Sequence, residues 1–286
     1  MNICPKIDQN LGGLKLLAEH VDNKVELQLL DYDLVEISKA INSLKQTCPK
    51  LKEIVIHMAE PLLYIDSFKS LAQDEPDLFV KFIAMLRELS EKLKLSFSLL
   101  FHCGWSEGRL TNEELINILS ELSDTMSKFN VSILLENTID DFGDLISYDR
   151  CGLIAKSVDK QNLGVCIDTS HLMAIINKNR FTRNTFLMYY RCVRPETVKH
   201  IHFSNVDDGD GFNDMSTHGT SHLSRTEVID TLELLDELRI DYNNTALVPE
   251  VMEPSNDYSD RTSQLKEIEL LKDVFNNKPI KILKRM

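Results

Sequence analysis

The sequence predicts a single parallel (β/α)8 barrel that spans residues 1–286. Short apolar segments alternate with amphipathic helical segments eight times, which is typical of α/β folds built on a parallel sheet. The length also suits one barrel, since such domains commonly run near 250 residues. Most of the apolar segments end at or beside His, Asp or Glu. In a barrel, the carboxyl ends of all strands open onto one face, where active sites are built.

The expected strands are short, apolar and bounded by polar or turn residues, as strands buried on both faces should be. They cover residues 2–7, 25–30, 53–58, 96–103, 131–138, 163–171, 198–205 and 245–251.

The expected helices show apolar residues at helical spacing between these strands. They cover residues 12–20, 33–44, 77–94, 111–129, 144–157, 182–193, 225–238 and 261–277. Thr111 precedes Asn112-Glu113-Glu114, which matches the capping box, and Asp33 and Thr182 stand where an N-cap is expected. No linker, repeat or low-complexity tract indicates a second domain.

The composition is that of an ordinary globular protein, with 43% hydrophobic and 27% charged residues. No apolar run approaches the roughly 18 residues that span a membrane. The first residues, MNICPKIDQN, lack an export pattern, so a cytoplasmic location is expected. The six cysteines show no CxxC spacing, which favours free buried thiols. The net charge of −13 weighs against nucleic acid as a tightly bound partner. Nothing in the pattern specifies an oligomeric state.

The polar residues at the strand ends are imidazole and carboxylate donors, the ligand types of Zn²⁺ and Mn²⁺. Because unpaired carboxylates gathered in one place would repel each other, a bound divalent metal is expected. The candidate ligands are His57, His102, Glu136, Asp168, His171, His202, His218 and Glu250.

Local spacing supports this set. Asp168 and His171 are three residues apart at the end of the sixth strand, so both can reach one cluster. Glu136 is followed by Asn137, whose amide could orient the carboxylate. Glu250 ends the eighth strand across the barrel from Glu136, and two facing carboxylates can serve as ligands or as an acid/base pair.

His200 and His202 alternate with apolar residues and therefore point to the same face of the seventh strand. His202 is nearer the open end and is the better ligand. His200 lies a layer deeper, where a neutral, hydrogen-bonded imidazole is expected.

These residues resemble the endonuclease IV family (AP endonuclease family 2), part of the larger xylose-isomerase-like barrel superfamily. The most specific segments are GVCIDTSHL (164–172), LLENT (134–138), FHCG (101–104) and LGGL (11–14). The resemblance covers most of the chain. It implies a cluster of two or three metals, with Glu136 and Glu250 as bridging carboxylates. It also matches Asp168 and His171 to a D-x-x-H pair.

The chain departs from that family at several positions. Ser216 stands where a D-x-H motif ending at His218 has Asp, and Asp214 is a candidate substitute. The segment after His202 reads Phe-Ser-Asn rather than x-Asn-Asp. The loop after the second strand reads LLDYD (29–33), whereas the nuclease family has a basic, aromatic DNA-reading loop.

Three functions fit the sequence. The first is metal-assisted hydrolysis of a phosphodiester or sugar-phosphate bond, on a small sugar-phosphate or a nucleic-acid end, without tight DNA binding. The second is sugar isomerisation or epimerisation at one metal, with Glu136 and Glu250 as acid and base. The third is a non-catalytic barrel with a structural metal. Substrate contacts are expected from Asn137, Asp214, His222 and Arg225. The early pair His57 and His102 favours the first function.

Overall fold

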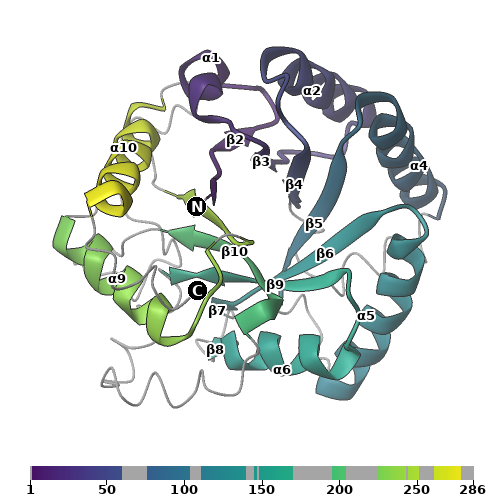
Figure 1. The fold of residues 1–286 in the computed structure, drawn as a ribbon. Helices are drawn as coiled ribbons and strands as arrows, with labels where there is room; N and C mark the ends of the chain where they lie inside the picture. Colours follow the sequence, from purple (N-terminus) through teal and green to yellow (C-terminus); the bar gives the residue numbers. More distant parts are fainter. Residues whose placement is uncertain are drawn as a thin grey trace.

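The computed structural model describes residues 2–59, 76–103, 111–139, 145–146, 148–169, 195–203, 225–242, 244–250 and 261–277. In these residues the chain forms a closed parallel barrel surrounded by helices (Figure 1). The barrel strands are β1 (Asn2–Ile3), β2 (Lys6–Asp8), β3 (Lys24–Gln28), β4 (Glu53–His57), β5 (Ser96–His102), β6 (Val131–Glu136), β9 (Leu163–Asp168), β10 (Val198–Phe203) and β11 (Ala246–Pro249).

The outer helices are α1 (Leu14–Leu17), α2 (Leu34–Thr47), α4 (Pro76–Leu93), α5 (Asn112–Ser127), α6 (Tyr148–Val158), α9 (Arg225–Glu237) and α10 (Thr262–Asn277). Two 3-10 turns, η1 (Ala18–His20) and η2 (Pro195–Thr197), and a small hairpin of β7 (Thr138–Ile139) and β8 (Leu145–Ile146) complete the described elements. All eight predicted strand positions are confirmed in their described residues. The helix expected at 182–193 lies outside the described residues.

Closure of the barrel depends on the first strand, which consists of β1 and β2. β1 pairs with β11 and β2 pairs with β3, so the two ends of the sheet meet in one chain segment. Pro5 stands between β1 and β2. It has no N–H to donate, but its carbonyl accepts a hydrogen bond from Glu26 N at 3.0 Å. The sheet is therefore a barrel of eight strand positions, as the sequence predicts.

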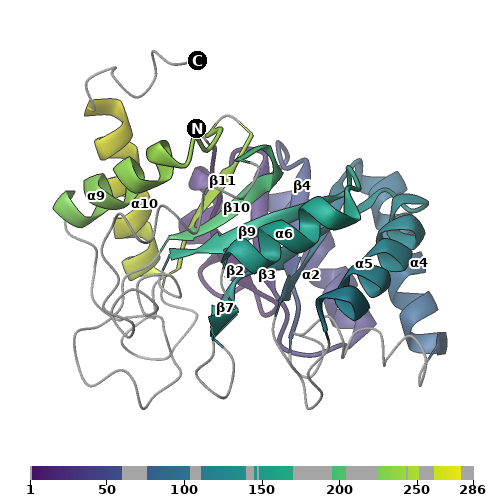
Figure 2. The same ribbon diagram turned by 90° about the horizontal axis from the view of Figure 1, so that it is seen from below.

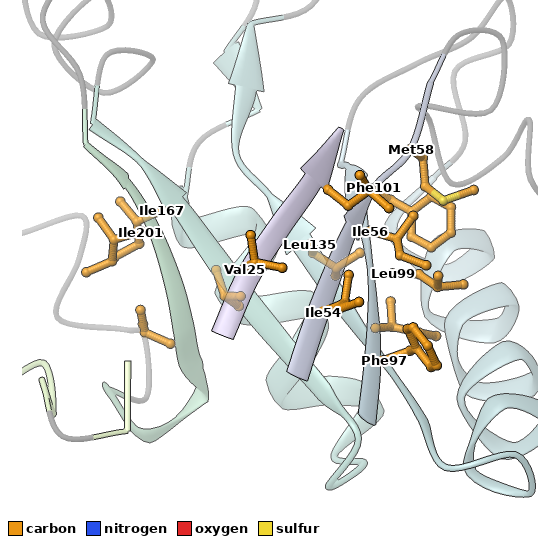
Figure 3. Packing of buried hydrophobic residues seen from close by; sticks show 14 of the residues in the cluster. Val25, Ile54, Ile56, Met58, Phe97, Leu99, Phe101, Leu135, Ile167 and Ile201 are labelled. Carbon is orange, nitrogen blue, oxygen red and sulfur yellow. The ribbon is translucent and has the colours of Figure 1, made fainter. Parts of the chain in front are cut away.

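The hydrophobic core lies mainly between the strands and the helices. Phe97, Leu99 and Phe101 alternate along β5 and belong to this layer, which Figure 3 shows along β4 and β5. The residues between them face the barrel interior, because side chains alternate across a strand. A small apolar layer of Val55, Leu100, Leu134 and Cys166 lies inside the barrel. The side chains two residues further along these strands form the next interior layer, toward the carboxyl ends.

Two predicted helix starts are confirmed. The Asp33 side chain accepts hydrogen bonds from Val35 N and Glu36 N at the start of α2. Thr111 and Glu114 form the expected reciprocal capping box at the start of α5. Viewed from the side in Figure 2, these helices flank the strands. None of the helices described by the structure is both long and apolar enough for a membrane span.

A buried ion pair, not anticipated from the sequence, ties the first strand to the last helix. Arg261 Nη2, just before α10, donates to Asp8 Oδ2 at 2.8 Å, and the two side chains are 6% and 5% exposed. The other Asp8 oxygen accepts a bond from Asn10 N at 2.8 Å. Gly13, the residue before α1, has a φ of 67°, a left-handed backbone conformation that favours glycine.

Because removing one partner leaves a buried charge unbalanced, we predict that Arg261→Met lowers the free energy of unfolding by about 3 kcal/mol. The matched control is Arg87→Met, which removes the exposed Arg87–Glu91 pair on α4 and should cost no more than about 0.5 kcal/mol. Urea unfolding followed by far-UV circular dichroism measures both. Equal losses in the two variants would contradict a special role for the buried pair.

Candidate metal centre

The interior layer at the carboxyl ends of the strands contains the predicted donors. His57, His102, Glu136 and Asp168 are the last residues of β4, β5, β6 and β9. His202 is the penultimate residue of β10, and Glu250 directly follows β11. The exposed fractions of the Glu136, Asp168 and His202 side chains are at most 1%. The barrel therefore brings together six of the eight residues predicted as metal ligands.

Four of these residues form one compact donor group, namely Glu136, Asp168, His202 and Glu250. One ligand atom from each lies within 4.8 Å of the others. His202 Nδ1 lies 3.0 Å from Glu136 Oε1, 2.9 Å from Glu250 Oε2 and 3.8 Å from Asp168 Oδ2. Three carboxylates thus surround one imidazole nitrogen.

A second donor group is formed by His57, His102 and Glu136. His102 Nε2 lies 3.6 Å, and His57 Nε2 4.0 Å, from Glu136 Oε2. Glu136 therefore presents Oε1 to the first group and Oε2 to the second. This is the arrangement of a carboxylate that can bridge two cations.

Two buried residues that the sequence analysis did not identify lie beneath these groups. Glu26, the middle residue of β3, is fully buried, and Lys6 of β2 is 9% exposed. Lys6 Nζ lies 3.1 Å from Glu26 Oε1, forms a salt bridge with Glu250, and lies 3.0 Å from His57 Nδ1. Lys6 is thus an internal counter-charge for two carboxylates.

Glu26 contacts three histidines. Its Oε2 lies 2.6 Å from His200 Nε2 and 2.8 Å from His202 Nε2, while its Oε1 lies 3.1 Å from His57 Nδ1. The signal in the sequence was a glutamate at an inward-facing position of VELQLL, a segment predicted to be a buried strand. A charge in a strand buried on both faces requires partners.

The electrostatics of the centre follow from its burial and its charges. Burial alone would raise the pKa of Glu136, but the imidazoles of His202 and His102 outweigh it and lower the pKa to about 2. Burial disfavours the charged form of His202, yet the acidic groups around it raise its pKa well above the usual value.

His200 behaves differently from its neighbour. Burial lowers the pKa of His200 to about 4, against the opposing influence of Glu26. The imidazole is therefore neutral at ordinary pH and donates to Glu26, as predicted for the deeper histidine. Cys166 belongs to the small apolar layer inside the barrel. Burial raises the pKa of its thiol to about 12, so it remains protonated.

Asn137 has a positional role at the end of β6. Its side-chain Oδ1 accepts from Asp168 N at 2.7 Å, and its Nδ2 donates to Asp168 O at 3.1 Å. These bonds fix the end of β9, and with it the carboxylate of Asp168, relative to Glu136. Arg225 is the first residue of α9. The predicted site residues His171, Asp214, His218 and His222 lie outside the described residues.

The donor set fits a divalent cation. The carboxylates of Glu26 and Glu250 contact the buried Lys6, and those of Glu136, Asp168 and Glu250 surround His202 Nδ1. Mixed carboxylate and imidazole donors suit Zn²⁺ or Mn²⁺. Five cysteines in the described part of the chain are buried thiols, as expected from their spacing.

Comparisons with known proteins agree with this architecture. The protein named "Probable endonuclease 4" of Carboxydothermus hydrogenoformans is 31% identical over 130 residues, which cover 44% of this chain and 43% of that protein. The match thus spans less than half of the length of this relative.

Solved structures with the same fold include the IolI protein with a bound zinc atom, with a TM-score of 0.60, 15% identity and 99% of each chain covered. A xylose isomerase domain-containing protein of Salmonella typhimurium LT2 has a TM-score of 0.61 at 16% identity, covering 96% of this chain and 98% of that one. An L-ribulose 3-epimerase has a TM-score of 0.59 at 14% identity, covering 98% and 100%. At these identities the likeness concerns the fold.

The family comparison covers much more of the sequence than the curated relative. The sequence profile described as xylose isomerase-like TIM barrel matches residues 23–274, a range that contains every strand from β3 to β11 and all six of the described donors. The chain therefore belongs to the xylose isomerase-like TIM barrel family.

Proposed function

We propose that this protein is a divalent-metal-dependent hydrolase that cleaves a phosphodiester or sugar-phosphate bond, in the manner of endonuclease IV-like enzymes. The observation that carries the proposal is the position of Glu136. Its two oxygens face different donor groups, one containing His202 and the other containing His57 and His102. A one-metal centre held by the first group would leave His57 and His102 without a role as metal ligands.

Zn²⁺ or Mn²⁺ would be held by Glu136, Asp168, His202 and Glu250 in the first group, and by Glu136, His57 and His102 in the second. When bound in such pairs, divalent ions lower the pKa of water and stabilise charge that develops on phosphoryl oxygens.

The chain itself determines where a substrate approaches. Glu250 and His102 have side chains that are 12% and 15% exposed, whereas Glu136, Asp168 and His202 are at most 1% exposed. The accessible side of the centre is therefore bordered by Glu250 and His102. Lys6 holds the Glu250 carboxylate from below, which restricts its rotation toward the reacting bond.

The partial sequence match to the endonuclease 4 relative supports a hydrolase. The charge of the chain indicates which substrate. With a net charge of −13, an extended polyanion would be repelled, whereas a small phosphate ester presents few charges to neutralise. We therefore assign a small sugar-phosphate or a nucleic-acid end as the substrate.

A second candidate function is the isomerisation or epimerisation of a sugar at one metal. Glu136 and Glu250 lie on either side of His202 Nδ1, at 3.0 and 2.9 Å, and could move a proton on the carbon beside a carbonyl. Solved structures of D-psicose 3-epimerase and L-ribulose 3-epimerase share the fold. The role of His57 and His102 separates the two candidates.

The metal content of the purified protein distinguishes the hydrolase from the isomerase. We predict at least two Zn²⁺ or Mn²⁺ ions per chain, and the loss of at least one in Glu136→Gln, because this substitution removes the charge shared by both donor groups. The matched control is Glu53→Gln at the opposite end of β4, where Glu53 pairs with Lys24, and it should keep the wild-type content. Elemental analysis of purified protein provides the measurement. A single ion per chain, unchanged in His57→Ala and His102→Ala, would favour the isomerase.

Glu250→Gln tests the reaction. The variant keeps the shape of the side chain but removes its charge at the accessible side of the centre. We expect kcat for a chromogenic phosphodiester such as bis(p-nitrophenyl) phosphate to fall at least about 100-fold. Metal content measured on the same sample shows whether a bound ion was lost as well. A wild-type rate in fully loaded Glu250→Gln, or activity on ketoses alone, would contradict the hydrolase proposal.

DNA binding provides an independent prediction. We expect a duplex with an abasic site to bind with a Kd no tighter than about 10⁻⁵ M at physiological salt, the range of weak non-specific binding. Fluorescence anisotropy at several salt concentrations gives both the affinity and its salt slope. Nanomolar binding that weakens steeply with salt, together with incision of the duplex, would instead establish a DNA-repair enzyme.

A further inference from the structure

Glu26 is the only carboxylate among the described residues near the centre that contacts the imidazoles from below rather than from the open end. Its Oε2 lies 2.8 Å from His202 Nε2. The other ring nitrogen, Nδ1, faces the first donor group, 3.0 Å from Glu136 Oε1. The two nitrogens of His202 thus have separate surroundings, one oxygen below and three carboxylates above.

This arrangement determines which nitrogen carries the proton when a metal is bound. An ionised carboxylate only accepts hydrogen bonds, so Nε2 must carry a hydrogen to bond Glu26. Nδ1 is then left with its lone pair directed at Glu136, Glu250 and Asp168. A carboxylate that accepts a hydrogen bond from the other ring N–H of a metal-binding histidine fixes the orientation of the ring and raises its basicity as a ligand.

From this geometry we infer that Glu26 is the positioning residue of the centre, which holds His202 as the Nδ1-coordinating tautomer. The inference rests on the proposed metal centre and adds a residue outside the ligand set. Glu26 is fully buried below the ligands, so it does not contact a substrate. It acts through His202.

The rest of the Glu26 environment favours a carboxylate at this position. His200 Nε2 donates to Oε2 at 2.6 Å, and Lys6 Nζ donates to Oε1 at 3.1 Å. Each oxygen therefore faces at least one donor. A glutamine would turn its NH₂ group toward one of these donors. Either His200 and His202, or Lys6, would then lose the acceptor. Glu26→Gln thus changes one heavy atom and, in either orientation of the amide, removes the negative charge that attracts the His202 N–H.

The first test measures zinc affinity by competition with a chromophoric chelator. We expect Glu26→Gln to bind zinc about 10–100-fold more weakly than wild type, the usual effect of losing such a partner. Glu26→Asp should recover part of this loss, because it keeps the acceptor. Glu53→Gln, the same substitution at the other end of the barrel, should leave the affinity unchanged. An affinity for Glu26→Gln within threefold of wild type would overturn the inference.

The second test measures the tautomer in the wild-type protein and uses a variant only to assign the signal. In ¹⁵N-histidine-labelled, zinc-loaded protein, NMR should show one histidine protonated at Nε2 and coordinated through Nδ1, and the signal should be missing in His202→Gln. Coordination of His202 through Nε2 would refute the role of Glu26. If wild type bound no zinc at all, the metal centre and the proposed function would fail instead, which keeps the two failures distinguishable.

Discussion

Repulsion between buried carboxylates is the constraint around which this barrel is organised. Closure of the sheet directs Glu26, Glu136, Asp168 and Glu250 into adjoining interior positions, largely away from water. Two like charges 4 Å apart repel by about 4 kcal/mol even at an effective dielectric constant of about 20. One lysine and the ring nitrogens of several histidines lie between the carboxylates and reduce this repulsion. Cation binding and the stability of the folded barrel are therefore linked through the same charges.

The sequence was sufficient to predict the barrel and the site residues at the carboxyl ends of its strands. Strand ends can be read from apolar segments, and parallel topology then places His57, His102 and Glu136 on one face without further information. Asp33 and Thr111 were equally readable, because capping is a local interaction between residues near each other in the chain.

Lys6, Glu26 and Arg261 could not be placed in the same way. Each has its function through a partner distant in the sequence, as in the Asp8–Arg261 pair. Glu26 also lies in the middle of a strand, whereas ligands are expected at the ends of the strands. Alternation gives its direction, but only the closed barrel shows that it meets His200 and His202, which lie across the interior on β10.

The same centre can be considered as two overlapping units. Glu136, Asp168, His202 and Glu250 would by themselves support proton transfer on a sugar, and the histidine pair adds a second donor group through one shared carboxylate. The family fold holds both arrangements with the same strands. The reaction thus depends on a few side chains at the strand ends, since fold alone does not determine function.

The seam of the barrel has a consequence for how the protein is made. β1 meets β11 through only two residue pairs, Asn2 with Ala246 and Ile3 with Leu247, whereas β5 and β6 share six. During synthesis the first strand leaves the ribosome long before β11 exists, so one of its edges stays unpaired while the rest of the sheet assembles. Glu250 follows β11 directly, and the last ligand of the first donor group therefore arrives with the strand that closes the barrel. A nascent chain therefore cannot assemble the complete first donor group before the sheet is closed.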